Sequence, residues 1–415
     1  MVTKHNIWRG SGGSHRQMGV LFASLLGVAV LLVPSSVARG EPVGAVDRSP
    51  AGAPYAAGEL IVTYEEAAPD NAVESLDEDA EVEDDLPALD ARVLAFPEVK
   101  DDPSQAARER DLEQIKEDLA LDPAVESVEY NYIGRLAYTP NDPKFKHQWG
   151  LKKTGFREAW NRTRGSRIKV AVVDTGAAVR HADLRHKVAD ARDLVNDDGT
   201  VQDLSGHGTH VSGIIAARTG NREGIAGGCP NCKLLIAKVF DGENTGTAAR
   251  FAEGIRWSAD HGAEVINLSF VHPASSAIEE TAIDYARDKD AVVVAAVGNG
   301  DTNKAVYPAA SPGVIAVAAT NSDDGRASFS NYGRWVDVAA PGVKILSTIP
   351  RGYASWSGTS MATPHVSALA GLLASQGRSR ANIENSITDT AVDLGPKGRD
   401  PYFGAGRISA DQALQ

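Results

Sequence analysis

The stretch IKVAVVD at 168–174 decides the fold class, because it is a short, almost uninterrupted apolar run that ends on a carboxylate. Similar runs recur along the chain as KLLIAKVF (233–240), AEVINLSF (263–270), AVVVAAVG (291–298) and GVIAVAA (313–319). Helical patterns at 208–217, 247–261 and 276–289 lie between several of them. Continuous apolar strands that alternate with helices indicate an α/β fold with a parallel sheet covered on both faces. In such folds ligands bind in loops beyond the carboxyl ends of the strands.

The first 38 residues are typical of a secretory signal. A basic stretch precedes the apolar run MGVLFASLLGVAVLLV (18–33), and small residues at Ser36 and Ala38 fit cleavage after Ala38. The alternative is a membrane anchor, but the run is shorter than the roughly 20 residues that a span needs. We therefore expect a secreted, extracellular protein with no membrane association once the signal is removed.

Residues 39–137 differ in composition from the rest of the chain. Strand-like stretches at 58–64, 91–97 and 125–134 and a helical stretch at 104–121 predict a small α/β unit. Between them, 65–91 holds twelve acidic residues and no basic one, and we expect it to be a mobile acidic loop. This unit holds 26 acidic and 8 basic residues, a net charge of −18, so it more than accounts for the formal net charge of −13 of the chain. No basic stripe suggests a nucleic-acid partner.

The chain has only two cysteines, Cys229 and Cys232. In an exported protein they permit one local disulfide, although two inert thiols remain an alternative. A zinc site would need two further ligands nearby, and the sequence has no second pair of this kind.

An aspartate, a histidine and a serine stand at the ends of predicted elements in an order that suits nucleophilic catalysis. Asp174 ends the first apolar strand, and SGHGTHVSG (205–213) places His207 and His210 at the start of a helix. The i, i+3 spacing would also suit metal ligands, but no HExxH pattern exists, and we expect His210 to be a packed side chain while His207 stays free. An activated serine needs a base, and the base needs a carboxylate that orients it.

The serine is expected in SWSGTSMATPH (355–365). Ser360 precedes a helix that should begin at about Met361, with Pro364 in its first turn, where a missing N–H costs nothing. The alternative for Ser360 alone is a helix N-cap. Asn299 ends another apolar strand, and its amide together with the Ser360 backbone N–H would hold the negative oxygen of a tetrahedral intermediate.

The motifs DTG (174–176), HGTHVSG (207–213) and GTSMATPH (358–365) resemble, in order, the three motifs of the subtilisin-like serine proteases, peptidase family S8. The resemblance covers essentially all of 138–415, and YTPNDPKF (138–145) and GLLASQGRS (371–379) point to the thermitase branch. It implies a three-layer αβα sandwich with a mainly parallel central sheet, preceded by a small α/β propeptide domain. It also implies Asp174, His207 and Ser360 as the catalytic triad and Asn299 as the oxyanion donor.

The same resemblance implies a zymogen. Residues 1–38 would be the signal peptide, 39–137 an inhibitory and fold-assisting propeptide, and 138–415 a catalytic domain that starts near Tyr138. The substrates would be polypeptides, and we expect a monomer.

Substrate-binding and calcium-binding residues are also implied by the resemblance. The edges that bind the substrate would be Asn244-Thr245-Gly246 and Ser269-Phe270-Val271. Val271 and Val297 replace smaller residues of the family, which predicts a narrower primary pocket. Structural Ca²⁺ would be held in two sites, the first by Asp142, Asp183 and Asn221 and the second by Asp193, Asp198 and Gln202.

The leading hypothesis is therefore a secreted serine endopeptidase. Two alternatives stay open: a non-catalytic binding module of the same fold, and a secreted esterase that uses the same acyl chemistry. Active-site labelling separates the first alternative, and a comparison of ester with amide substrates separates the second.

Overall fold

The computed structural model describes residues 45–50, 53–65, 80–134 and 138–415. Residues 1–134 and 135–415 form two compact units, a division close to the predicted boundary at 138. The predicted signal peptide lies outside the described residues. Within the described part of the chain, no helix is both long and apolar enough to cross a lipid bilayer.

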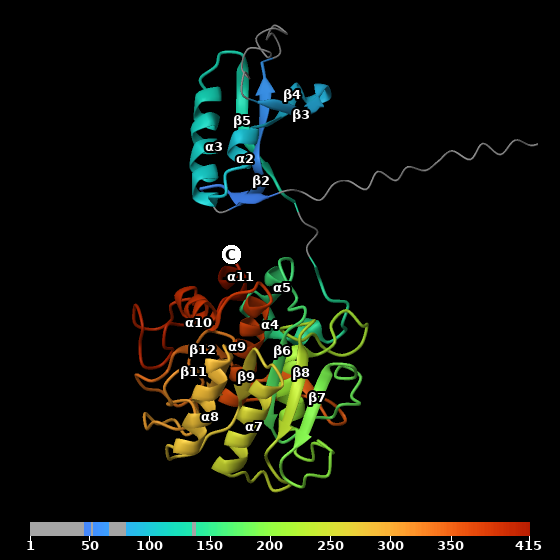
Figure 1. The fold of residues 1–415 in the computed structure, drawn as a ribbon, viewed down its shortest axis with the longest axis vertical. Coiled ribbons are helices and arrows are strands. Elements are labelled where there is room, and N and C mark those ends of the chain that lie inside the picture. Colours follow the sequence, from blue (N-terminus) through green and yellow to red (C-terminus); the bar gives the residue numbers. More distant parts are fainter. Residues whose placement is uncertain (1–44, 51–52, 66–79, 135–137) are drawn as a thin grey trace, which may run out of the picture. The chain divides into compact units, whose positions relative to one another are not determined.

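The N-terminal unit is an antiparallel sheet with a helix packed on it (Figure 1). Its strands are β1 (Val46–Arg48), β2 (Pro54–Tyr64), β3 (Glu81–Leu86), β4 (Ala91–Ala95) and β5 (Val125–Tyr132). A 3₁₀ turn (Pro87–Leu89) and the short helix α2 (Pro97–Lys100) flank β4, and α3 (Gln105–Leu119) is the main helix. Leu60, Leu94, Leu112 and Tyr130 are buried between sheet and helix. A small core of this kind agrees with the predicted α/β unit.

The acidic stretch corrects one prediction. Residues 66–79 lie outside the described part, but Glu81–Leu86 form a regular edge strand, β3, paired with β4. All but the last of its side chains are exposed. The strand therefore exists through backbone pairing with β4, a source of order that composition does not reveal.

The C-terminal unit is a three-layer αβα sandwich, as expected. Its sheet has seven parallel strands in the order β12-β11-β10-β9-β6-β8-β7. The strands are β6 (Lys169–Asp174), β7 (Val188–Asp193), β8 (Lys233–Lys238), β9 (Val265–Leu268), β10 (Val292–Ala296), β11 (Val314–Thr320) and β12 (Val338–Pro341). The helices are α4 (Trp149–Lys153), α5 (Phe156–Ala159), α6 (His207–Ala216), α7 (Ala248–Asp260), α8 (Ala277–Asp288), α9 (Thr359–Ala374), α10 (Arg380–Asp389) and α11 (Ala410–Ala413), with a 3₁₀ turn at Phe145–His147.

Alternate side chains of each strand face opposite helix layers. Val170 and Val172 of β6 pack into a cluster with α6 and α9, whereas Ala171 and Val173 pack into a second cluster with α7 and α8. Figure 1 shows α7 and α8 side by side over one face of the sheet. Because both faces are covered, both sets must be apolar, which explains the continuous apolar runs.

The prediction missed β7, β12 and the antiparallel hairpin of β13 (Ile345–Ile349) and β14 (Gly352–Trp356). The β7 sequence VADARD contains three charged residues and lies at the sheet edge, where half of its side chains are exposed. The hairpin is outside the main sheet and ends two residues before α9 begins. Its backbone therefore leads the chain directly into the helix that carries Ser360.

Helix α9 begins earlier than predicted. Its N-cap is Gly358, so Ser360 lies in the first turn and Pro364 lies inside the helix, in its second turn. A proline there removes the hydrogen bond to the carbonyl four residues earlier, which belongs to Ser360. That carbonyl instead accepts from the Ser269 hydroxyl at 3.1 Å. The proline is tolerated because a side chain from another loop replaces the missing N–H.

Candidate active site

The predicted site residues gather at the carboxyl edge of the parallel sheet. From β6 the chain builds β8 and β7 on one side and β9 to β12 on the other, so the strand order reverses between β6 and β9. Asp174 ends β6, Ser269 follows β9, and Asn299 follows β10, the next strand. Such a switch point is where open α/β sheets leave a crevice for a ligand.

Asp174 and His207 form a close pair in this crevice. His207 Nδ1 lies 2.8 Å from Asp174 Oδ1 and 3.0 Å from Oδ2. The Asp174 side chain is 1% exposed and that of His207 is 28% exposed. Asp174 Oδ1 also accepts from the backbone N–H of Thr175 at 2.7 Å. Because Nδ1 is committed to the carboxylate, Nε2 is the nitrogen left free to exchange a proton.

Two opposing effects set the pKa of His207. Burial lowers it, but the negative charge of Asp174, the hydrogen bond to that carboxylate and the charge of Asp203 together raise it more. The result is a pKa above the ordinary histidine value. The imidazolium that forms when His207 takes a proton is therefore stabilised in place.

Asp203 is a buried carboxylate that the sequence analysis missed. Its two oxygens accept from the Gly206 and Thr209 N–H groups, at 2.7 and 2.9 Å, and from the hydroxyls of Thr175 and Thr209. These bonds satisfy the free N–H groups where α6 begins and so fix the orientation of His207. An acid four residues before the helix-initial histidine was the available signal.

Ser360 lies within reach of the β9 loop. Its hydroxyl donates to the Ser269 carbonyl at 2.9 Å, and the Ser269 hydroxyl donates back to the Ser360 carbonyl. In the described residues its Oγ makes no hydrogen bond to His207. The N-cap alternative is wrong, since Gly358 occupies that position and no side chain caps the helix.

Asn299 is held by its carbonyl oxygen, which leaves its NH₂ group available. Asn299 Oδ1 accepts from the backbone N–H of Thr359 at 2.8 Å and from its hydroxyl at 3.0 Å. A Cβ built on Gly358 would lie 3.6 Å from Asn299 Nδ2 and 3.8 Å from the Ser360 backbone nitrogen. Two N–H donors therefore border one small space, which stays open because Gly358 has no side chain.

The buried Asn331 supports this arrangement from behind. Its amide donates to the Val297 carbonyl at 2.8 Å, and its oxygen accepts from the N–H of Gly300 at 2.8 Å. These bonds fix the loop that carries Asn299. Asn331 is distant in sequence from every motif, so nothing in the sequence singled it out.

The two predicted substrate edges meet through aromatic rings. Phe270 packs on Phe251 with ring centroids 4.3 Å apart and on Phe240 at 5.4 Å. A Cβ on Gly246 would come within 2.3 Å of the Phe251 ring, so this position needs glycine. Asn244 takes a left-handed conformation with φ of 61°, in a turn in which the Asp241 carboxylate accepts from the Thr245 N–H at 2.9 Å.

Val271 and Val297, the two valines predicted to narrow the primary pocket, differ in solvent exposure. Val271 is 42% exposed, whereas Val297 has no exposed surface and packs in the core cluster between the sheet and α7 and α8. The expectation that the Val297 side chain lines an open pocket is therefore wrong. It fails because the apolar run of β10 continues into the core for one residue beyond the strand.

His210 is a packed side chain, as expected. It is fully buried, it stacks on Trp356 with centroids 4.6 Å apart, and burial lowers its pKa to about 4. His207 is committed to Asp174, so the two histidines do not form a metal site.

The first predicted calcium set comes together. The buried Asp142 accepts from the N–H groups of Gly220 and Asn221, and the amide of Asn221 donates to the buried Asp183 at 2.8 Å. Asp183 also accepts from the Tyr353 hydroxyl at 3.0 Å. Burial and the neighbouring charge of Asp183 raise the pKa of Asp142 above its usual range. Neither carboxylate has an ion-pair partner within the described ranges, so the two buried acids are stabilised by hydrogen bonds alone.

The second set fits a cation poorly. The buried Asp193 already pairs with the buried Lys238, whose Nζ lies 3.4 Å from Oδ2. Asp198 is exposed, accepts from Thr200 and interacts with Asp193, but within the described residues no hydrogen bond joins the Gln202 side chain to these acids. The Lys238 ammonium thus already balances the charge of the one buried carboxylate in this set.

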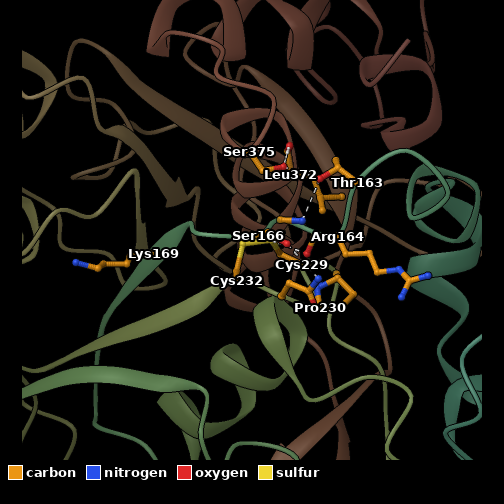
Figure 2. The surroundings of a disulfide bond; sticks show 12 residues. Thr163, Arg164, Ser166, Lys169, Cys229, Pro230, Cys232, Leu372 and Ser375 are labelled. Atoms are coloured by element: carbon orange, nitrogen blue, oxygen red, sulfur yellow. Dashed lines mark hydrogen bonds between the residues drawn. A yellow bond between two sulfur atoms is a disulfide. The ribbon is translucent and has the colours of Figure 1, made fainter. Parts of the chain in front are cut away.

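Cys229 and Cys232 form a disulfide, with Cα atoms 5.3 Å apart. Figure 2 shows the bond beside Leu372 of α9 and the segment of Thr163 and Arg164. Both cysteines are fully buried, and a Cβ on Gly371 of α9 would lie 2.9 Å from Cys232 Sγ. The disulfide therefore packs under the helix that carries Ser360, far along it from the nucleophile.

Comparison with known proteins agrees with this geometry. Residues 165–406 match the subtilase family, and residues 41–131 match the fervidolysin N-terminal prodomain. The chain is 48% identical over 280 residues to thermitase from Thermoactinomyces vulgaris, covering 67% of this chain and 100% of thermitase. It is 45% identical over 306 residues to a thermophilic serine proteinase from Bacillus sp. strain AK1, covering 73% of this chain and 76% of that protein.

A solved protease structure from Pseudoalteromonas arctica superimposes with a TM-score of 0.62 at 30% identity, covering 67% of this chain and 99% of that one. The chain therefore belongs to the subtilase family and is a serine endopeptidase preceded by a prodomain.

Proposed function

We propose that this chain is made as an exported zymogen whose mature part hydrolyses peptide bonds through an acyl-enzyme on Ser360. His207 takes the Ser360 proton as Oγ attacks the scissile carbonyl and then returns it to the leaving amine. Asp174 holds the imidazole with Nε2 free and stabilises its cation without being protonated. The 2.8 Å contact of His207 Nδ1 with Asp174 supports these roles.

Attack requires the Ser360 hydroxyl to leave the Ser269 carbonyl. Rotation between staggered positions about χ1 is enough to re-aim it. In free enzymes catalytic hydrogen bonds commonly tighten only when substrate binds. We therefore assign the Ser269 contact to the resting enzyme.

The observation that carries the proposal is the space at Gly358. The amide of Asn299 and the backbone N–H of Ser360 both border it, next to the nucleophile. Two fixed donors there stabilise the oxyanion of the tetrahedral intermediate, and they need no reorganisation during the reaction. Ser360 is also in the first turn of α9, where the helix dipole favours negative charge.

An extended peptide would bind as an added strand between the two predicted edges. Within the described residues, neither Phe270 nor Val271 makes a backbone hydrogen bond, so their N–H and C=O groups are available to a substrate. Ser269 joins this edge to the nucleophile through its paired bonds with Ser360.

Self-processing tests the proposal in the full chain. A host that secretes the protein should release a form that starts near Tyr138, and the Ser360→Ala variant should accumulate as an uncleaved precursor. N-terminal sequencing of both secreted forms checks this. Normal processing and proteolysis by Ser360→Ala would overturn the assignment of the nucleophile.

We further propose one structural calcium site, formed by Asp142, Asp183 and Asn221. A bound Ca²⁺ would supply positive charge to two buried carboxylates that have no ion-pair partner within the described residues. It would link the segment that precedes the 3₁₀ turn at Phe145–His147, the loop after β6 and the loop at 218–225. The second set of acids is not proposed as a site, because Lys238 already neutralises Asp193.

A further inference from the structure

A second carboxylate–histidine pair lies behind the predicted substrate edge. Glu279, in the first turn of α8, is 2% exposed, and its Oε2 lies 2.6 Å from His272 Nε2. In the described residues, neither Glu279 oxygen accepts a hydrogen bond, and His272 Nε2 has no hydrogen-bond partner either, so the close approach of the two groups is a charge contact. Burial raises the pKa of Glu279, and the charge of His272 acts against this rise. His272 is therefore the one partner that compensates a nearly dry carboxylate.

His272 directly follows the open edge formed by Phe270 and Val271. Its backbone exchanges two hydrogen bonds with Tyr307, at 2.8 and 2.9 Å. Its ring lies parallel to those of Phe251 and Tyr307, with centroids 6.2 and 6.4 Å away. The imidazole thus lies near two aromatic rings and contacts Glu279 at the start of α8.

The open edge, Phe270 and Val271, is consequently held by contacts at both of its ends. At one end Ser269 exchanges hydrogen bonds with Ser360, and at the other end His272 contacts Glu279. The two residues between these anchors have free backbone groups, and Val271 is 42% exposed. The position of this edge relative to the nucleophile therefore depends on both anchors.

We propose that His272 and Glu279 are positioning residues that hold the Phe270–Val271 edge in register for an extended peptide substrate. This inference rests on the proposed function of Ser360. It assigns the pair to binding of the peptide backbone and not to the chemical steps, because the nearest atoms to a Cβ built on Gly358 belong to Asn299, Met361 and Ser360 and not to the pair.

The energetics of a buried pair give the proposal a distinct signature. Removing one partner leaves the other buried and uncompensated, and that group then moves toward water or changes its proton occupancy. Such a movement would shift the edge or the start of α8. Replacing both partners by neutral amides removes the charge while it keeps hydrogen-bonding groups in place, which is far less disruptive.

The test uses enzyme matured from the full chain, with four variants. These are His272→Gln, Glu279→Gln, the double variant, and His261→Gln as a matched control. His261 forms a comparable pair with Asp190, but at 3.7 Å and with both side chains exposed. Kinetics are measured with a tetrapeptide p-nitroanilide, which uses the edge, and with phenylmethylsulfonyl fluoride, which reaches the serine without it.

Each single variant should raise KM for the tetrapeptide about tenfold and change kcat less than about threefold, a size typical of coupled neighbours. The rate of inactivation by phenylmethylsulfonyl fluoride should stay within about twofold of the parent enzyme, because a reagent that bypasses the edge does not sense it. The double variant should recover most of the lost affinity, and the His261 control should change neither constant.

Unchanged KM in both single variants would overturn the inference. A double variant whose loss of binding free energy equals the sum of the losses in the two single variants would also overturn it. If a single variant fails to mature, the double variant alone decides: near-parental KM supports the pair as a unit, and a large loss refutes it. Failure of phenylmethylsulfonyl fluoride to inactivate the parent enzyme would instead refute the proposed role of Ser360.

Discussion

The molecule contains two carboxylate–histidine pairs of similar construction and different use. In both, the carboxylate is nearly dry, at 1% exposed for Asp174 and 2% for Glu279, and the imidazole is partly exposed, at 28% and 21%. His207 uses Nδ1 for its acid and keeps Nε2 free, whereas His272 commits Nε2. In His207 the nitrogen left free is Nε2, the one proposed to exchange the proton of Ser360, whereas in His272 the contact through Nε2 serves the proposed positioning role.

The largest expected effect is on kcat, which should distinguish the Asp174–His207 pair from the Glu279–His272 pair. Asp174→Asn should lower kcat by about 10⁴-fold, because the amide no longer holds the reactive tautomer. Glu279→Gln should leave kcat nearly unchanged. Initial rates at saturating peptide check both, and equal losses of kcat would remove the distinction between the pairs.

The Asp174→Asn variant should also shift the pH profile of kcat/KM. His207 acts only when neutral, so kcat/KM of the parent enzyme should rise with pH through the raised pKa of His207. Burial lowers that pKa and the Asp174 charge raises it, so in Asp174→Asn only the lowering by burial and the weaker influence of Asp203 remain. The midpoint should therefore shift to lower pH, and an unmoved midpoint would contradict the assignment of this pair.

The space beside the first pair offers the next test. Gly358→Ala places a methyl group between Asn299 Nδ2 and the Ser360 N–H without a backbone clash. It should reduce kcat about 100- to 1,000-fold, the usual cost of losing an oxyanion donor, with little change in melting temperature. Asn299→Ala should match it. A Gly358→Ala enzyme with full activity would show that the oxyanion forms elsewhere.

In a third group of buried acids, no histidine contacts a carboxylate within the described residues, which sharpens the comparison. If Asp142 and Asp183 hold Ca²⁺, saturating calcium at about 100 times Kd should add about 2.7 kcal/mol to the free energy of unfolding. Thermal melts with calcium and with a chelator measure this. Asp183→Asn should abolish the difference and Asp193→Asn should preserve it. The opposite pattern would move the site to the second set.

The smallest effect is expected at the disulfide, remote from both pairs. Replacing Cys229 and Cys232 by alanine should cost about 2 kcal/mol of stability, as expected for a short closed loop. Neither KM nor kcat should change, since the bond supports α9 far from Ser360. A change in either constant would mean that the geometry of the two carboxylate–histidine pairs depends on packing along the whole of α9.

The sequence predicted the layers of the fold better than their edges. Strands buried on both faces can be recognised in the sequence by their continuous apolar runs. Strands β7 and the acidic β3, by contrast, are ordered by backbone pairing with a neighbouring strand. Pro364 was placed in the first turn because a proline inside a helix is costly. The hydroxyl that makes it tolerable belongs to Ser269, which is 95 residues away in sequence and visible only in the fold.

The residues of the site divide in the same way. Asp174, His207, Ser360 and Asn299 stand at the ends of regular elements, inside long motifs, and could be picked out. Asp203, Asn331 and the His272–Glu279 pair act through contacts between different elements, and short polar residues in loops carry no periodic signal. The prediction for Val297 is wrong because the sequence at the end of a strand does not show whether a side chain lines a pocket or packs in the core.

The central claim is that Ser360 is a nucleophile activated by His207. The most direct measurement treats the secreted enzyme with a fluorophosphonate and maps the adduct by mass spectrometry. We predict a single adduct on Ser360, and none within the same time in His207→Ala. Peptide cleavage by an enzyme that stays unlabelled at Ser360, or labelling that does not need His207, would contradict the account.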